Sequence, residues 1–173
     1  RIDYTGGGCP HILAEPQRKN EITYSEDFSQ SYWTKASPTV EGGFISPDGT
    51  ENAFKLIETT AESVHAFYNP TFGVNNGDTY TISLFIKYNG RQWFRLWGQF
   101  GSTNKEAYFD IENGLLGQKD SGVTSKIEDY GNDWYRISAS ATSDGTNGRF
   151  RGYLALDDGD SFYQGNGTSG AFI

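Results

Sequence analysis

The sequence predicts an all-β protein, a sandwich of two antiparallel sheets, from three observations. Aromatic residues make up 16% of the 173 residues and 22 residues are glycine, so short apolar runs are separated by turn-forming residues. Several runs alternate strictly between apolar and polar side chains, as strands with one buried face do. No amphipathic helix of useful length and no internal repeat appears in the sequence. Roughly nine to eleven strands with turns at this spacing are typical of a sandwich.

The totals limit the organisation and the partners. A chain of 173 residues is one domain with room for a substantial core, and we expect residues 1–20 to be a lead-in segment docked on a module of residues 21–173. A net charge of −8 argues against nucleic acid, which needs a basic surface. No apolar run is long enough for a membrane span, and the single Cys9 excludes an internal disulfide. Because the chain begins at Arg1 without a signal peptide, we expect it to be covalently part of a larger protein.

Residues 78–100 carry the strongest strand signal. In the first half, apolar residues alternate with a second set that includes Phe85 and Lys87. Asn89 and Gly90 then favour a tight hairpin turn, because both residue types accept a positive φ. The second half alternates again, with apolar even-numbered residues. We therefore expect two neighbouring strands of one sheet.

The other expected strands follow similar patterns. Residues 53–58 fit either a helical turn or a strand, and the surrounding pattern favours the strand. Clusters of Gly, Asn, Asp and Pro separate the runs. The strands predicted outside the central stretch are residues 22–24, an edge strand within 36–50, 53–58, 64–69, 107–111, 123–130, 134–141, 149–156 and 170–173.

The odd-numbered residues in the second half of the central stretch form the main candidate site. Trp93, Arg95, Trp97 and Gln99 share one strand face, an unusual mixture of two indoles and two polar side chains. Sugars present C–H faces that aromatic rings cover and hydroxyls that Arg and Gln hydrogen-bond, so this face suits a flat, hydroxyl-rich ligand. Two alternatives stay open. Either one indole faces the second sheet and the arginine is solvated, or the face is a protein interface.

Two further groups of residues extend this candidate site. If the hairpin forms, Phe85 and Lys87 lie beside the tryptophans on the paired strand. Arg149, Arg151 and Tyr153 share a face of another strand and form a second candidate patch, for which a solvated basic strand is the alternative. If both patches lie on one sheet, this acidic protein gains a basic face. We then expect uronic or sulfated glycans to be preferred.

For the remaining aromatic, histidine and acidic residues, the sequence favours ordinary structural roles over binding or catalysis. Trp33 and Trp134 each lie beside a turn at a strand end, and we expect both to pack in the core. His65 is isolated, so a His-based catalytic or metal site is poorly supported. A glycosidase needs two carboxylates across a cleft. Candidates such as Asp110 with Glu112 lie in or beside turns, so we expect no catalytic residues.

Five segments of the sequence carry a family likeness. In order they are TYSEDFSQSYWTK (23–35), SPDGTENAFKL (46–56), GDTYTISLFIKYNGRQW (77–93), YFDIENG (108–114) and IEDYGNDWYRISA (127–139). Together they resemble a β-sandwich module of phage tail and virion proteins and of some polysaccharide-degrading enzymes, similar to the carbohydrate-binding modules of families 4, 9 and 22. The likeness covers nearly the whole chain. It implies a jelly roll of two antiparallel sheets, no catalysis, and a sugar on the concave sheet or at the loop edge. It also implies a structural Ca2+ with Asp27 in the matching first position, and no other cofactor.

The sequence therefore favours a non-catalytic carbohydrate-binding module that attaches a larger parent protein to a polysaccharide. Its location would be extracellular or virion-associated. The alternative from another class is a structural or assembly module of a phage tail or virion protein, which binds protein and no sugar. A jelly-roll lyase or hydrolase is a further alternative.

Overall fold

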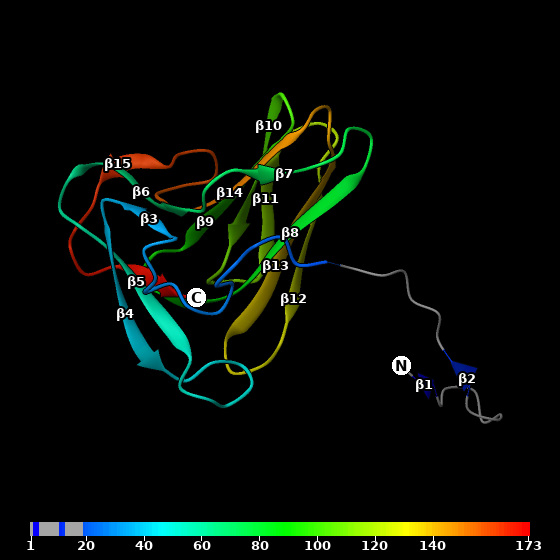
Figure 1. Ribbon diagram of the computed structural model, residues 1–173. Coiled ribbons are helices and arrows are strands. Elements are labelled where there is room, and N and C mark those ends of the chain that lie inside the picture. Colours follow the sequence, from blue (N-terminus) through cyan, green and yellow to red (C-terminus); the bar gives the residue numbers. More distant parts are fainter. Residues whose placement is uncertain (1, 4–10, 13–18) are drawn as a thin grey trace.

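The structure, a computed structural model, describes residues 2–3, 11–12 and 19–173 (Figure 1). It confirms the all-β sandwich of two antiparallel sheets. The eight-stranded sheet has the order β11-β10-β9-β14-β6-β15, with β3 paired to β6 and β7 paired to β14. Its strands are β3 (Thr34–Ala36), β6 (Glu62–Tyr68), β7 (Phe72–Gly73), β9 (Trp93–Phe100), β10 (Thr103–Asp110), β11 (Leu115–Lys119), β14 (Asn147–Ala155) and β15 (Phe162–Gln164).

The second sheet has six strands in the order β12-β13-β8-β16-β5-β4. They are β12 (Thr124–Asp129), β13 (Trp134–Thr142), β8 (Thr79–Asn89), β16 (Gly170–Phe172), β5 (Ala53–Glu58) and β4 (Pro38–Phe44). The described part of the chain contains no helix with the length and apolarity that a membrane crossing requires.

The lead-in segment contributes a two-stranded ladder, in which β1 (Ile2–Asp3) pairs with β2 (His11–Ile12). Cys9 and most of the predicted lead-in lie outside the described residues, so its docking on the domain stays a prediction. The strand predicted at residues 22–24 is wrong. Ile22 is in irregular chain, and Thr23 and Tyr24 begin a turn in which Tyr24 has a φ of 56°.

The predicted hairpin over residues 78–100 is also wrong, although both of its strands exist. β8 belongs to the six-stranded sheet and β9 to the eight-stranded sheet. A tight hairpin turn of the expected type needs a positive φ at both central residues, and here Gly90 has one whereas Asn89 does not. The alternation of each strand was correctly predicted because both cover the same core from opposite sides. Alternation fixes which face is buried, and does not fix the neighbouring strand.

A buried ion pair holds the chain where it crosses between the sheets. Arg91 donates from Nη2 to Glu58 Oε1 (2.6 Å) and from Nε to Glu58 Oε2 (2.9 Å), and Glu58 is only 1% exposed. Tyr163 Oη and the backbone N–H of Asn166 donate to the same carboxylate. Burial alone would raise the pKa of Glu58, but these hydrogen bonds hold it below its ordinary value. Burial and the hydrogen bond to Glu58 raise the pKa of Tyr163.

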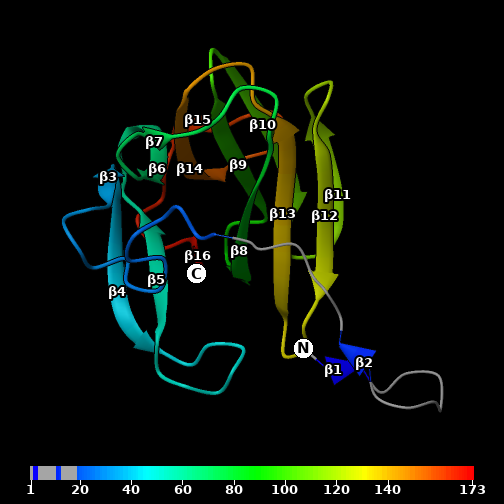
Figure 2. The ribbon, with the colours of Figure 1, turned by 45° about the vertical axis from the view of Figure 1, so that its right-hand side comes forward.

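The six-stranded sheet is split along part of its length. The short strand β16 joins β8 to β5, pairing with β8 only at Tyr88 and Lys87, so the rest of β8 has no strand partner on that side among the described residues. Residues 19–33 run through the gap between β5 and β8 (Figure 2). They place Phe28 and Trp33 in the core, where Phe28 packs edge-on against Phe67 of the opposite sheet. This loop segment therefore substitutes for missing sheet.

Candidate functional site

The odd-numbered side chains of β9 lie on the outer face of the eight-stranded sheet. Their even-numbered neighbours are buried in the core, whereas the odd-numbered residues are half-buried. The strand register then builds rows across the sheet. We call this surface the arginine–aromatic face, and its members are Tyr68, Trp93, Arg95, Trp97, Gln99, Glu106, Tyr108, Arg149, Arg151 and Tyr153.

One row of this face runs Glu106–Trp97–Arg151–Tyr68 from β10 to β6. The Arg151 guanidinium carbon lies 4.6 Å from the Trp97 ring centroid and 4.9 Å from that of Tyr68. Two aromatic rings therefore hold one cation by cation–π contact, which restricts its rotamers before any ligand arrives.

The neighbouring row runs Tyr108–Arg95–Tyr153, and both terminal nitrogens of its arginine are engaged, whereas Arg95 Nε is buried without a partner among the described residues. Arg95 forms an ion pair with Glu106, donates to Ser161 Oγ (2.8 Å), and lies 4.6 Å from the Tyr153 ring centroid. Tyr153 and Tyr108 are buried, and burial raises the pKa of Tyr108 above its ordinary value. Arg95 and Tyr153, predicted as ligand contacts, are therefore internal to the face.

Trp93 lies against the edge of the face beside β11. A Cβ on Gly117 would come within 2.6 Å of Trp93 Cζ3 and 2.5 Å of Asp158 Oδ1, so the indole, this glycine and the loop at residues 157–161 are in close contact. The loop is held by Asp158, whose Oδ1 accepts from the Gln118 N–H (2.7 Å). This end of the face is thus partly covered.

The other end of the face is half-buried and carries two arginines, Arg149 and Arg151, that make few hydrogen bonds with the described residues; the Nε atoms of both are buried without a partner there. Arg151 donates only to Tyr153 Oη (3.3 Å), and Arg149 makes no side-chain hydrogen bond with the described residues. Within the described part of the chain, neither arginine has a carboxylate partner. Trp97, Gln99 and Tyr68 are half-buried around them. The structure thus brings the two predicted patches together on one sheet.

The prediction that Phe85 and Lys87 neighbour these tryptophans is wrong, because β8 lies in the other sheet. Both residues are on the outer face of the six-stranded sheet. Lys87 Nζ donates to the carbonyl of Asn132 (2.7 Å) and contacts Asp133, whereas the Phe85 ring meets Tyr130 edge-on.

The candidate metal ligand Asp27 is engaged in its own turn. Its carboxylate accepts from the Ser29 N–H and Oγ through Oδ1 and from Gln30 Nε2 through Oδ2. These hydrogen bonds, led by that of the Ser29 side chain, lower the pKa of Asp27. Within residues 2–3, 11–12 and 19–173, no group of three or more His, Cys, Asp or Glu side chains is placed to hold a metal ion. Ca2+ binding through Asp27 therefore has no support from neighbouring acidic ligands in this part of the chain.

The carboxylates considered for catalysis also cap turns. Asp110 accepts from the backbone N–H groups of Glu112 and Asn113 and from the side chains of Gln92 and Asn113. Burial alone would raise the pKa of Asp110, but these bonds lower it. Asp158 holds β11, as described above. Asp110, whose two carboxylate oxygens both accept hydrogen bonds, is therefore poorly suited to proton transfer.

The two tryptophans assigned to packing, Trp33 and Trp134, are both buried, and His65 is fully buried beside Tyr163.

Three residues of the arginine–aromatic face were not predicted from the sequence: Tyr68, Glu106 and Tyr108, which complete the rows. Tyr68 follows an inward-facing Phe67 on β6, so its outward direction was readable from the alternation. Its position beside Arg151 was not, because that contact joins distant parts of the chain.

Comparison with known proteins adds no assignment: no protein-family model matches this chain, and no curated protein matches it.

Proposed function

We propose that this domain is a non-catalytic glycan-binding module and that the part of the arginine–aromatic face formed by Tyr68, Trp97, Gln99, Arg149 and Arg151 holds an acidic polysaccharide. The observation that supports it most is the pair of adjacent arginines, held by aromatic rings and without carboxylate partners in the described chain. In a protein of net charge −8, such a pair is a local basic site.

The chemistry of the face fits a carboxylated or sulfated sugar better than a neutral one. A guanidinium recognises carboxylate or sulfate oxygens with paired N–H donors, which a hydroxyl matches less well. The half-buried ring of Trp97 and the Gln99 amide are beside these donors and are suited to a sugar ring and its hydroxyls. We expect modest affinity per site, with avidity supplied by several copies in the parent protein.

Binding to arrayed polysaccharides tests the proposal. We expect the domain to bind uronic or sulfated glycans, with affinity that falls as salt is added, because the contacts are charged and partly exposed. Arg151→Gln should weaken binding about tenfold, since it removes one charge-assisted contact. Arg136→Gln is the matched control: this arginine lies on the outer face of the other sheet and pairs with Glu128.

Two results would contradict the proposal. One is full glycan affinity in the folded Trp97→Ala, Arg151→Gln double variant. The other is an equal loss in the Arg136→Gln control, which would point to the overall charge of the protein and not to this face.

The structural or assembly module remains a second candidate because of the sheet edge. Among the described strands, β11 pairs only with β10, and its Leu115 and Leu116 are exposed. An exposed apolar edge strand is a template for pairing with another chain. Light scattering on a sizing column should show an oligomer that Leu115→Lys dissociates if assembly is the function, and a monomer if it is not.

A further inference from the structure

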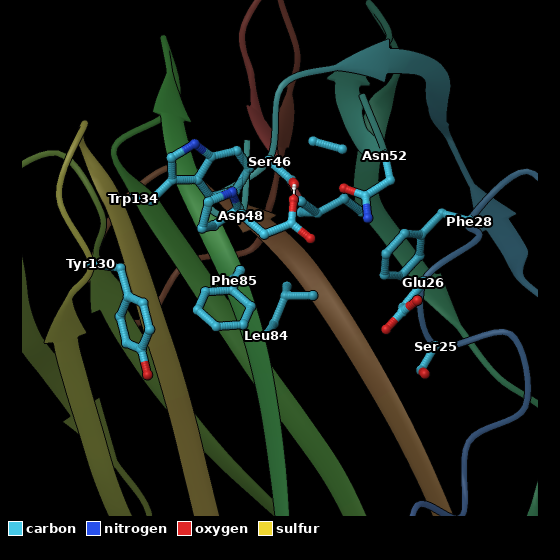
Figure 3. Close-up of a pocket in the computed structure, with 13 residues that line it drawn as sticks. Ser25, Glu26, Phe28, Ser46, Asp48, Asn52, Leu84, Phe85, Tyr130 and Trp134 are labelled. Carbon is cyan, nitrogen blue, oxygen red and sulfur yellow. Dashed lines mark hydrogen bonds between the residues drawn. The ribbon is translucent and has the colours of Figure 1, made fainter. Parts of the chain in front are cut away.

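A pocket of about 350 Å3 opens in the six-stranded sheet, at the split between β8 and β5. We call it the split-sheet pocket, and Figure 3 shows its two sides. Phe85, Tyr130 and Trp134 lie on one side, and Glu26, Asn52 and the turn carrying Asp48 lie across from and above them. Its volume is within the range of small-ligand sites.

The aromatic side is built by one strand and one turn. Phe85 points outward from β8, and Tyr130 and Trp134 flank the turn at residues 131–133. Lys87 binds the Asn132 carbonyl in this turn, which fixes Tyr130 beside Phe85 with ring centroids 4.9 Å apart. Phe85 is 37% exposed and Tyr130 52% exposed, while Trp134 is buried as the wall behind them. These rings have faces and edges available to a ligand.

The opposite side carries negative charge. Two carboxylates, Glu26 and Asp48, line the pocket, and no Lys, Arg or His is among the described residues that line it. Asp48 Oδ1 accepts hydrogen bonds from Ser46 Oγ (2.6 Å), the Thr50 N–H (2.9 Å) and Thr50 Oγ1 (2.7 Å). None of these three bonds uses Asp48 Oδ2, so that oxygen can accept from a ligand. The turn therefore fixes a carboxylate in place.

Exposed aromatic rings facing carboxylates match a cation that carries apolar groups. An ammonium ion with alkyl substituents gains cation–π contact with the rings, apolar contact with the pocket walls, and attraction to the carboxylates. The two carboxylates disfavour an acidic sugar here. We propose that the split-sheet pocket binds a substituted ammonium group.

Titration with choline tests this inference, with dimethylbutanol, its neutral carbon isostere, as the comparison. We expect saturable choline binding, at least about tenfold tighter than that of the isostere, because only the cation gains from rings and carboxylates. Parallel titrations with trimethyllysine and lysine amides would show whether the group belongs to a small molecule or to a protein side chain.

Three variants locate the site. Phe85→Ala and Glu26→Gln should each weaken choline binding by about threefold to tenfold. Phe162→Ala is the matched control, because Phe162 is an exposed strand phenylalanine (59%) in the other sheet. Unchanged thermal unfolding confirms that each variant is folded.

The inference fails if the isostere binds as tightly as choline, if no ammonium probe binds saturably, or if both pocket variants keep full choline affinity. It also fails if Phe162→Ala weakens binding as much as Phe85→Ala.

Discussion

The arginine–aromatic face and the split-sheet pocket combine aromatic rings with charge in opposite ways. On the face, the cations are stacked on the rings, so Arg95 and Arg151 are part of the folded sheet. In the pocket, the rings of Phe85 and Tyr130 are exposed and the fixed charges are carboxylates on the opposite side. The two regions therefore differ in the charge of the ligand that each prefers. A face with its cations preorganised suits an anion, and rings facing carboxylates suit a cation.

The largest expected effect is a loss of folding stability, which would affect the face and the pocket together. Arg91→Ala leaves Glu58 buried without its partner where the chain crosses from one sheet to the other, and we expect a loss of about 3–5 kcal/mol in the free energy of unfolding. Denaturant unfolding measures it. Arg136→Ala removes an exposed ion pair with Glu128 and should cost at most about 1 kcal/mol. Equal losses in the two variants would show that the crossing is not held as described.

The same pair predicts how stability depends on pH. Because the folded pKa of Glu58 lies below its ordinary value, its stabilisation is fully present above about pH 4.3 and is lost as the pH falls through the lower folded pKa. Glu58→Gln cannot titrate. The stability gap between wild type and Glu58→Gln should therefore be widest near neutral pH and should narrow in acid. A gap that widens in acid would contradict this assignment.

A smaller effect separates the two regions. Trp97→Ala should weaken acidic-glycan binding about tenfold and leave choline binding unchanged, because it removes a ring of the face only. Phe85→Ala should do the reverse. Calorimetric titration of both ligands into both variants measures this. If either substitution lowers the affinity for both ligands equally, the two surfaces are not independent sites.

The smallest effect concerns the charge in the pocket. Hydrogen bonds from the Ser46 side chain and from Thr50 hold the pKa of Asp48 below its ordinary value, so this carboxylate stays ionised in mild acid. In the Glu26→Gln background, choline affinity should therefore hold from neutral pH down to about pH 4 and decline only below it. NMR titration at several pH values would show this, and a decline beginning near neutral pH would exclude Asp48 as the remaining charge.

The sequence predicted the faces of the strands better than their neighbours. Period-two alternation assigned Phe94 and Leu96 to the core and Trp97 to the outer surface, and all three are so placed. It did not reveal that β8 and β9 lie in different sheets. That depends on the φ of Asn89 and on the Arg91–Glu58 pair, which joins residues far apart in the chain.

Long-range contacts also explain which site residues were missed. Arg149 and Arg151 were predicted as a patch, but their stacking on Tyr68 follows from the pairing of β14 with β6. The split-sheet pocket gave no local signal, because Glu26, Phe85 and Tyr130 come from three separate segments and meet only where β16 is too short to close the sheet.

The proposal of a glycan face is tested most directly by titrating an acidic oligosaccharide into the labelled domain and following the indole N–H resonances of its four tryptophans. The account predicts a large shift for Trp97 and none for the buried Trp33 and Trp134. A shift of Trp134 together with the amides of residues 130–133, while Trp97 stays fixed, would place the sugar at the other sheet and contradict it.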